Sequence, residues 1–133
     1  MRVLLDTHVW VWTQEQPERL GPRTKRLLTG VEHENAVCPI STLEISRLVA
    51  AGEISLSIPL AEWVGQSMAD LAAQTVSVSH EVAAEAYALP GTFHRDPADR
   101  VLVAAARRNG LTFVTADDRI LSYPHVRTQD ARR

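Results

Sequence analysis

Residues 3–10 read VLLDTHVW, a short apolar run that ends in an acid. The apolar residues 3–5 predict a buried strand, and Asp6 comes directly after them. Aspartate is a common turn residue, so Asp6 could simply mark the end of the strand. Its role therefore depends on which residues stand at the ends of the other strands of the chain.

Length and composition favour a single domain. The chain has 133 residues, 45% of them hydrophobic, which is enough for a core of its own, so we expect residues 1–133 to form one domain. Cys38 is the only cysteine, which excludes an internal disulfide and a zinc site built on cysteines. No apolar run approaches the roughly 20 residues that span a bilayer, and no signal peptide pattern opens the chain. We therefore expect a cytoplasmic protein without membrane contacts.

Short apolar strands alternate with helices along the chain. The strands are predicted at residues 3–5, 36–40, 75–78 and 111–114. The main helices are predicted at residues 22–31, 41–52, 60–73, 80–89 and 96–110. Apolar strands separated by helices indicate a parallel sheet covered on both faces. The expected fold class is therefore α/β, a three-layer α/β/α sandwich with a central, mostly parallel sheet.

Acidic residues gather where these strands end, at the edge where such sheets bind ligands. They are Asp6, Glu44, Asp96, Asp99, Asp117 and Asp118. Crowded carboxylates repel one another, so we expect a cation to hold them together. Oxygen ligands without cysteine suit Mg²⁺ or Mn²⁺. Such a site favours phosphoryl chemistry, in which one ion activates a water and another stabilises the leaving oxygen.

Several of these acids also have a purely structural explanation. Ser41 with Glu44 and Thr115 with Asp118 have the spacing of capping boxes. Asp96 stands at a helix N-cap, before a proline at the first helical position. If capping is their only role, the protein is a non-catalytic one that binds a partner or RNA. The acids that stand directly after apolar strands fit this alternative least.

Two histidines lie close to these acids in the sequence. His8 comes two residues after Asp6, and His94 comes two residues before Asp96. Either could reach the site as an extra ligand or a phosphate contact. We expect both to have supporting or packing roles.

Four ordered motifs resemble those of PIN-domain proteins of the VapC toxin type. They are LDTHVWVW at residues 5–12, STLEI at 41–45, DPADRVLVAAA at 96–106 and VTAD at 114–117. The resemblance spans essentially the whole chain. One departure is Leu43, because many relatives have a tryptophan before the glutamate, and we expect Leu43 to fill the same pocket.

The resemblance implies a metal-dependent endoribonuclease, the toxin of a type II toxin–antitoxin system, that leaves a 5′-phosphate and a 3′-hydroxyl. It implies Mg²⁺ or Mn²⁺ as the cofactor. The implied partners are an RNA substrate (tRNA, rRNA or mRNA) and a cognate antitoxin, in a homodimer or a toxin–antitoxin hetero-oligomer. A nuclease of RNA maturation or decay is the alternative within the same family.

The resemblance also implies the site residues. The four acidic positions of the family fall on Asp6, Glu44, Asp99 and Asp117, which are the expected catalytic residues, with Asp6, Asp99 and Asp117 as metal ligands. The expected supporting residues are Thr115, Asp96, Asp118, Arg100 and His8. Of these, Thr115 is expected to orient a carboxylate or a water, and Asp96 to cap a helix beside the metal. Arg100 is expected to contact phosphate or to form a structural ion pair.

Overall fold

The computed structural model describes residues 1–133 and contains one five-stranded sheet in the order β3-β2-β1-β4-β5. Its strands are β1 (Arg2–Leu5), β2 (Glu34–Val37), β3 (Gln74–Thr75), β4 (Thr112–Thr115) and β5 (Thr128–Asp130). Every neighbouring pair is parallel, as predicted. β5 was not predicted, because its sequence TQD has no apolar run.

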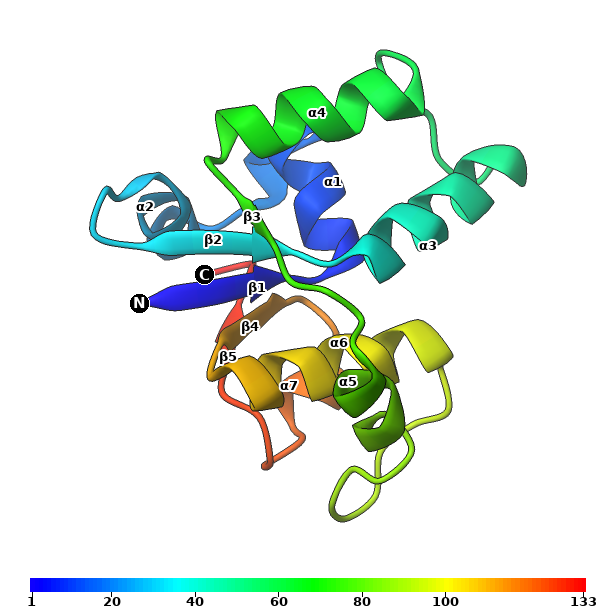
Figure 1. The fold of residues 1–133 in the computed structure, drawn as a ribbon. Helices are drawn as coiled ribbons and strands as arrows, with labels where there is room; N and C mark the ends of the chain where they lie inside the picture. Colours follow the sequence, from blue (N-terminus) through cyan, green and yellow to red (C-terminus); the bar gives the residue numbers. More distant parts are fainter.

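Helices cover both faces of the sheet. They are α1 (Thr7–Glu15), the 3₁₀ helix η1 (Pro17–Arg19), α2 (Pro22–Thr29), α3 (Pro39–Ala50), α4 (Leu60–Asp70), α5 (His80–Glu85), α6 (Pro97–Asn109) and α7 (Asp118–Leu121). Figure 1 shows α1, α2 and α4 on one side of the sheet and α5, α6 and α7 on the other. This arrangement confirms the predicted three-layer sandwich. None of the helices has the length and the apolar composition needed to cross a lipid bilayer.

The central strand β1 connects two cores. Leu4 packs in a cluster with the apolar residues of α5 and α6, whereas Val3 and Leu5 pack in a second cluster with α1, α2 and Trp63 of α4. All three strand residues are fully buried. Side chains alternate between the two faces of a strand, so a continuous apolar run is what a sheet covered on both sides requires.

The connection order reverses between β1 and β4, and this brings distant residues together. Leu5 lies opposite Val114 in the parallel register, and the backbone N–H of Asp6 donates to the carbonyl of Val114 at 2.9 Å. Ligand sites of parallel sheets form at such a reversal, beyond the carboxyl ends of the strands. The residues that come after β1 and β4 therefore meet at this edge.

α3 begins earlier than predicted, and the capping box at Ser41 is wrong. Cys38 is the N-cap and Pro39 occupies the first turn, where a proline loses no hydrogen bond. Ser41 is fully buried inside the helix and accepts a hydrogen bond from the hydroxyl of Thr7 at 2.9 Å. Glu44 therefore lies beyond the first turn. The expected packing of Leu43 is also wrong, because 65% of its surface is exposed.

Candidate active site

A pocket of about 320 Å³ lies beyond the carboxyl ends of β1 and β4. Its lining includes all four residues predicted to be catalytic, together with Asp96, His8 and Arg119. The acids come from separate elements, since Asp6 comes after β1, Glu44 lies on α3, Asp99 lies on α6 and Asp117 comes after β4. The fold therefore brings together the acids that the sequence leaves far apart.

Asp6 is held at both carboxylate oxygens. Its Oδ1 accepts from the backbone N–H of Thr7 at 2.8 Å, so that Asp6 is the N-cap of α1, and its Oδ2 accepts from the hydroxyl of Thr115 at 2.6 Å. Only 7% of Asp6 is exposed. Burial raises the pKa of Asp6 from 3.8 to about 6, although both hydrogen bonds act in the opposite direction. Asp6 is thus a carboxylate held in one position, and its ionisation lowers the stability of the folded protein.

Thr115 connects the first acid to the last. Its hydroxyl donates to Asp6 and accepts from the backbone N–H of Asp117 at 3.0 Å. The predicted capping box of Thr115 with Asp118 is wrong, because Asp117 is the N-cap of α7. Thr115 instead orients the carboxylate of Asp6, which is one of the two roles expected for it.

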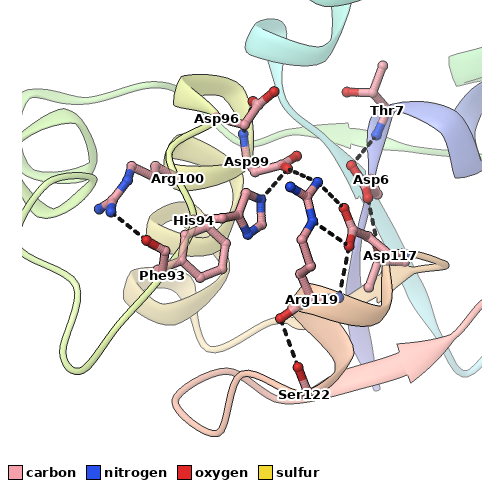
Figure 2. Close-up of polar contacts among 11 residues, drawn as sticks. Asp6, Thr7, Phe93, His94, Asp96, Asp99, Arg100, Asp117, Arg119 and Ser122 are labelled. Carbon is pink, nitrogen blue, oxygen red and sulfur yellow. Dashed lines mark hydrogen bonds and ion pairs between the residues drawn. The ribbon is translucent and has the colours of Figure 1, made fainter.

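Asp99 is paired with a histidine from the preceding loop. The Nε2 of His94 lies 2.6 Å from Oδ2 of Asp99, and their side chains are only 15% and 13% exposed (Figure 2). The His94 ring stacks on Phe93 at a centroid distance of 4.2 Å, which fixes its orientation. Burial raises the pKa of Asp99, whereas the hydrogen bond from His94 lowers it. Asp96 is the N-cap of α6, as predicted, and accepts from the backbone N–H of Asp99 at 3.0 Å.

Three ligand atoms in or beside the pocket lie close enough to share one cation. His94, Asp99 and Asp117 each offer an atom within 4.8 Å of the other two. Asp6 and Glu44 line the same pocket outside this close group. Glu44 forms no hydrogen bond or ion pair with the protein, and its negative charge raises the pKa of Asp99. Its oxygens are therefore available to a ligand.

Arg119 is a site residue that the sequence did not reveal. Its Nη2 lies 2.8 Å from Oδ2 of Asp117 and 4.0 Å from Oδ2 of Asp99, and its Nε lies 3.2 Å from Oδ1 of Asp117 (Figure 2). These contacts hold the pKa of Asp117 below its usual range. The only sequence signal was its place two residues after Asp117, which does not fix the direction of a long side chain.

A family model described as the PIN domain matches residues 3–126 of the chain. The chain belongs to the PIN-domain family. Ribonuclease VapC22 of Mycobacterium tuberculosis is 40% identical to it over 127 residues, which cover 94% of each protein. The resemblance to PIN-domain proteins of the VapC type is therefore confirmed.

Solved structures of toxin–antitoxin complexes share this PIN fold. VapBC2 of Rickettsia felis, bound to a DNA fragment from its promoter, has a TM-score of 0.68 at 15% identity and covers 97% of this chain and 98% of its own. FitAcB of Neisseria gonorrhoeae has a TM-score of 0.65 at 25% identity and covers 98% of both chains. The first likeness concerns the fold alone.

Three predicted supporting residues of the PIN domain do not line the pocket: Arg100, Asp118 and Thr115, which is buried behind Asp6. Arg100 donates to the backbone carbonyls of Ala86 and Phe93 at 3.0 and 2.9 Å and pairs with no acid, so the expected ion pair is wrong, and the phosphate contact stays a prediction. It ties the loop before α6 to the region after α5. Asp118 is exposed and pairs with Arg132 at 2.7 Å. His8, which is exposed, does line the pocket.

Proposed function

We propose that the protein is a metal-dependent endoribonuclease, the toxin of a type II toxin–antitoxin system. The observation that supports this proposal most is the pocket in which Asp6, Glu44, Asp99 and Asp117 converge from four parts of the chain. Membership of the PIN-domain family and the 40% identity to Ribonuclease VapC22 support the same activity. The substrate is RNA, and the reaction is hydrolysis of a phosphodiester bond.

The donor set fits Mg²⁺ or Mn²⁺. Carboxylate oxygens dominate the pocket, and the imidazole of His94, which lies beside it, is a ligand that Mn²⁺ accepts. In this proposal Asp6, Asp99 and Asp117 hold the metal. When bound, the ion supplies a water of lowered pKa and positive charge beside the scissile phosphate.

The residues of the chain position this chemistry. Thr7 and Thr115 hold Asp6 rigidly, and His94 holds Asp99. Glu44 has no protein partner, so it is placed to take a proton from the attacking water. The water oxygen forms a bond to phosphorus, the bond from phosphorus to the 3′-oxygen breaks, and that oxygen takes up a proton. The products carry a 5′-phosphate and a 3′-hydroxyl.

The partners belong to the same proposal. Solved neighbours with this fold are toxin–antitoxin complexes, which supports a cognate antitoxin for this chain. The assembly is then a homodimer or a toxin–antitoxin hetero-oligomer. We also propose that residues 1–133 form one PIN-like domain, since both hydrophobic cores pack on the same sheet.

The test is cleavage of a mixed tRNA and rRNA pool by antitoxin-free protein in Mg²⁺, in Mn²⁺ or with a chelator. Wild type and Asp6→Asn are compared with the matched control Asp118→Asn, whose carboxylate lies outside the pocket. We expect discrete products from wild type and from the control, and none from Asp6→Asn or with the chelator. Cleavage that survives both the chelator and Asp6→Asn would contradict the proposal.

Toxicity separates the toxin from a nuclease of RNA maturation or decay. Expression of the wild type is expected to arrest growth, and co-expression of the neighbouring gene to relieve the arrest. Growth that continues normally while RNA is cleaved would favour the maturation or decay role.

A further inference from the structure

The side chain of Arg119 lies across the space between two carboxylates of the acidic pocket. Its Nη2 is 2.8 Å from Asp117 and 4.0 Å from Asp99, and 64% of the side chain is exposed. The guanidinium therefore occupies a position that a cation bridging the two acids would need. An ion pair this exposed is weak, so a divalent cation has little to overcome in displacing it.

Hydrogen bonds hold the backbone of Arg119, whereas its side chain is exposed. Its backbone N–H donates to Oδ1 of Asp117 at 2.9 Å, and its carbonyl accepts from the hydroxyl of Ser122 at 3.2 Å (Figure 2). These contacts fix the backbone of α7. A displaced guanidinium would therefore stay at the margin of the site, at the end of a flexible side chain.

Arg119 also lines a second pocket next to the first. This pocket has a volume of about 250 Å³ and includes Phe93, His94, Ser122 and Tyr123. Arg119 thus lines both pockets, the first with acids and the second with His94 and the rings of Phe93 and Tyr123. The rings of Phe93 and Tyr123 are themselves buried, so Arg119 is the exposed cationic group that an RNA strand extending beyond the acids would meet on this side.

We infer that Arg119 is a resident counter-ion of the metal site with two successive roles. It competes with the divalent cation for Asp99 and Asp117, and once displaced it binds a phosphate of the RNA strand at the border between the two pockets. A guanidinium presents a planar set of donors that matches phosphate oxygens, so the same group serves both roles. The inference rests on the proposed ribonuclease function for its second role only.

Arg132 provides a matched control. It is also an exposed arginine that pairs with two aspartates, Asp118 and Asp130, at 2.7 and 2.9 Å. It lines neither of the two pockets. Arg132→Gln therefore removes the same charge from the same side of the molecule without touching the acidic pocket.

The first experiment measures Mn²⁺ affinity by isothermal titration calorimetry on the full chain. We expect Arg119→Gln to bind Mn²⁺ about tenfold more tightly than wild type, because a neighbouring positive charge is removed. Arg119→Lys should lie between them, and Arg132→Gln should match wild type. Equal or weaker Mn²⁺ binding by Arg119→Gln would overturn the competition.

The second experiment measures binding of a labelled single-stranded RNA by fluorescence anisotropy, in saturating Mn²⁺ and at low temperature. We expect Arg119→Gln to bind the RNA more weakly and to lower the slope of log affinity against log salt by about 0.7, the value for one phosphate contact on a single strand. A slope equal to those of wild type and Arg132→Gln would overturn the phosphate role.

The two experiments separate the inference from the function on which it depends. If wild type neither binds nor cleaves RNA, the proposed function and the phosphate role both fail. The Mn²⁺ titration still decides whether Arg119 competes with the cation, because it requires no RNA.

Discussion

The two ends of the sheet differ in how many of their charged side chains have a partner within the protein. At the amino ends of β4 and β5, a pocket of about 650 Å³ is lined by three arginines and one acid. There Arg107 and Arg108 both pair with Glu85, at 3.1 and 3.5 Å, and Arg127 donates to the carbonyl of Gly110. The larger cavity is therefore a region in which the chain satisfies its own polar groups.

At the carboxyl ends, five acids line one smaller pocket together with Arg119 and His8. Only Arg119 and His94, which lies beside the pocket, form ion pairs with these acids, and Glu44 has no partner at all. Burial raises the pKa values of Asp6 and Asp99, which means that their charges cost free energy. The difference teaches that carboxylates without a partner in the protein, more than cavity size, mark the functional end of the sheet.

The sharpest test exchanges one glutamate for glutamine at each end. Glu44→Gln removes an unpartnered carboxylate from the acidic pocket and should lower the rate of RNA cleavage about 100-fold, the size expected for a lost proton acceptor. Glu85→Gln should leave that rate unchanged, because Glu85 serves only the arginines of the other end. Initial rates at equal folded concentration, checked by circular dichroism, decide it. Equal losses of activity in both variants would break the comparison.

A divalent metal ion should stabilise the protein by binding only at the acidic pocket beyond the carboxyl ends of the strands. Mn²⁺ at about 100 times its dissociation constant should raise the free energy of unfolding by about 2.7 kcal/mol. Asp99→Asn should lose most of this gain, because Asp99 belongs to the close group of ligand atoms. Thermal unfolding with and without Mn²⁺ measures the effect, and Asp118→Asn is the control. A full gain in Asp99→Asn would show that the metal binds elsewhere.

Asp6→Asn should stabilise the metal-free protein at neutral pH. The folded pKa of Asp6 is about 6 and its ordinary value is 3.8, so between these values the unfolded chain loses its proton while the folded chain keeps it. The contribution of Asp6 to the free energy of unfolding therefore falls as the pH rises from 4 to 6. Above pH 6 the protein bears the full free-energy cost of the buried charge. We expect a gain of about 1 to 2 kcal/mol at neutral pH, because an amide recovers only part of the cost.

The measurement for Asp6 is urea unfolding of both proteins across this pH range in the presence of a chelator. The advantage of Asp6→Asn should disappear as the pH falls through 3.8, where the unfolded chain also takes up the proton. A difference in stability that stays constant from low to neutral pH would show that the charge of Asp6 is not its cause.

The smallest expected effect is on the free energy of unfolding, when Glu85 is changed in the pocket at the amino ends of β4 and β5. Glu85→Gln should lower the free energy of unfolding by about 1 kcal/mol, since Arg107 and Arg108 lose a shared and partly buried partner. Glu44→Gln should not lower it, because Glu44 pairs with nothing. Urea unfolding at neutral pH compares the two variants, and a larger loss in Glu44→Gln would contradict the contrast.

The sequence was sufficient to predict the elements that build the site. The apolar runs before Asp6 and before Asp117 predicted two strands, and parallel pairing then placed both acids at the same edge. The capping alternative was right for Asp96, and Asp6 and Asp117, the two acids expected to fit it least, are N-caps as well. An acid can cap a helix with one oxygen and still present lone pairs to the pocket, so the two explanations do not compete.

The rest required three-dimensional contacts. α3 begins at Pro39, two residues before the predicted start at Ser41. Ser41 therefore lies inside the helix, where it is buried against Thr7. Arg100 was expected at the acids because it stands next to Asp99, yet successive helical residues point in different directions. It therefore meets the carbonyls of the preceding loop instead. The direction of Arg119 depends on side-chain torsions that spacing does not determine.

The hydroxyl of Thr115 has a consequence for how acid inhibits the enzyme. It accepts a hydrogen from Asp117, so its own hydrogen must point to Oδ2 of Asp6, while Thr7 supplies a hydrogen to Oδ1. Each carboxylate oxygen has two lone pairs, so Asp6 has one left on each oxygen for the pocket. A proton and a metal ion must therefore compete for the same two lone pairs of Asp6. Acid should act as a competitive inhibitor of metal, and added Mn²⁺ should reverse the loss of activity below pH 6.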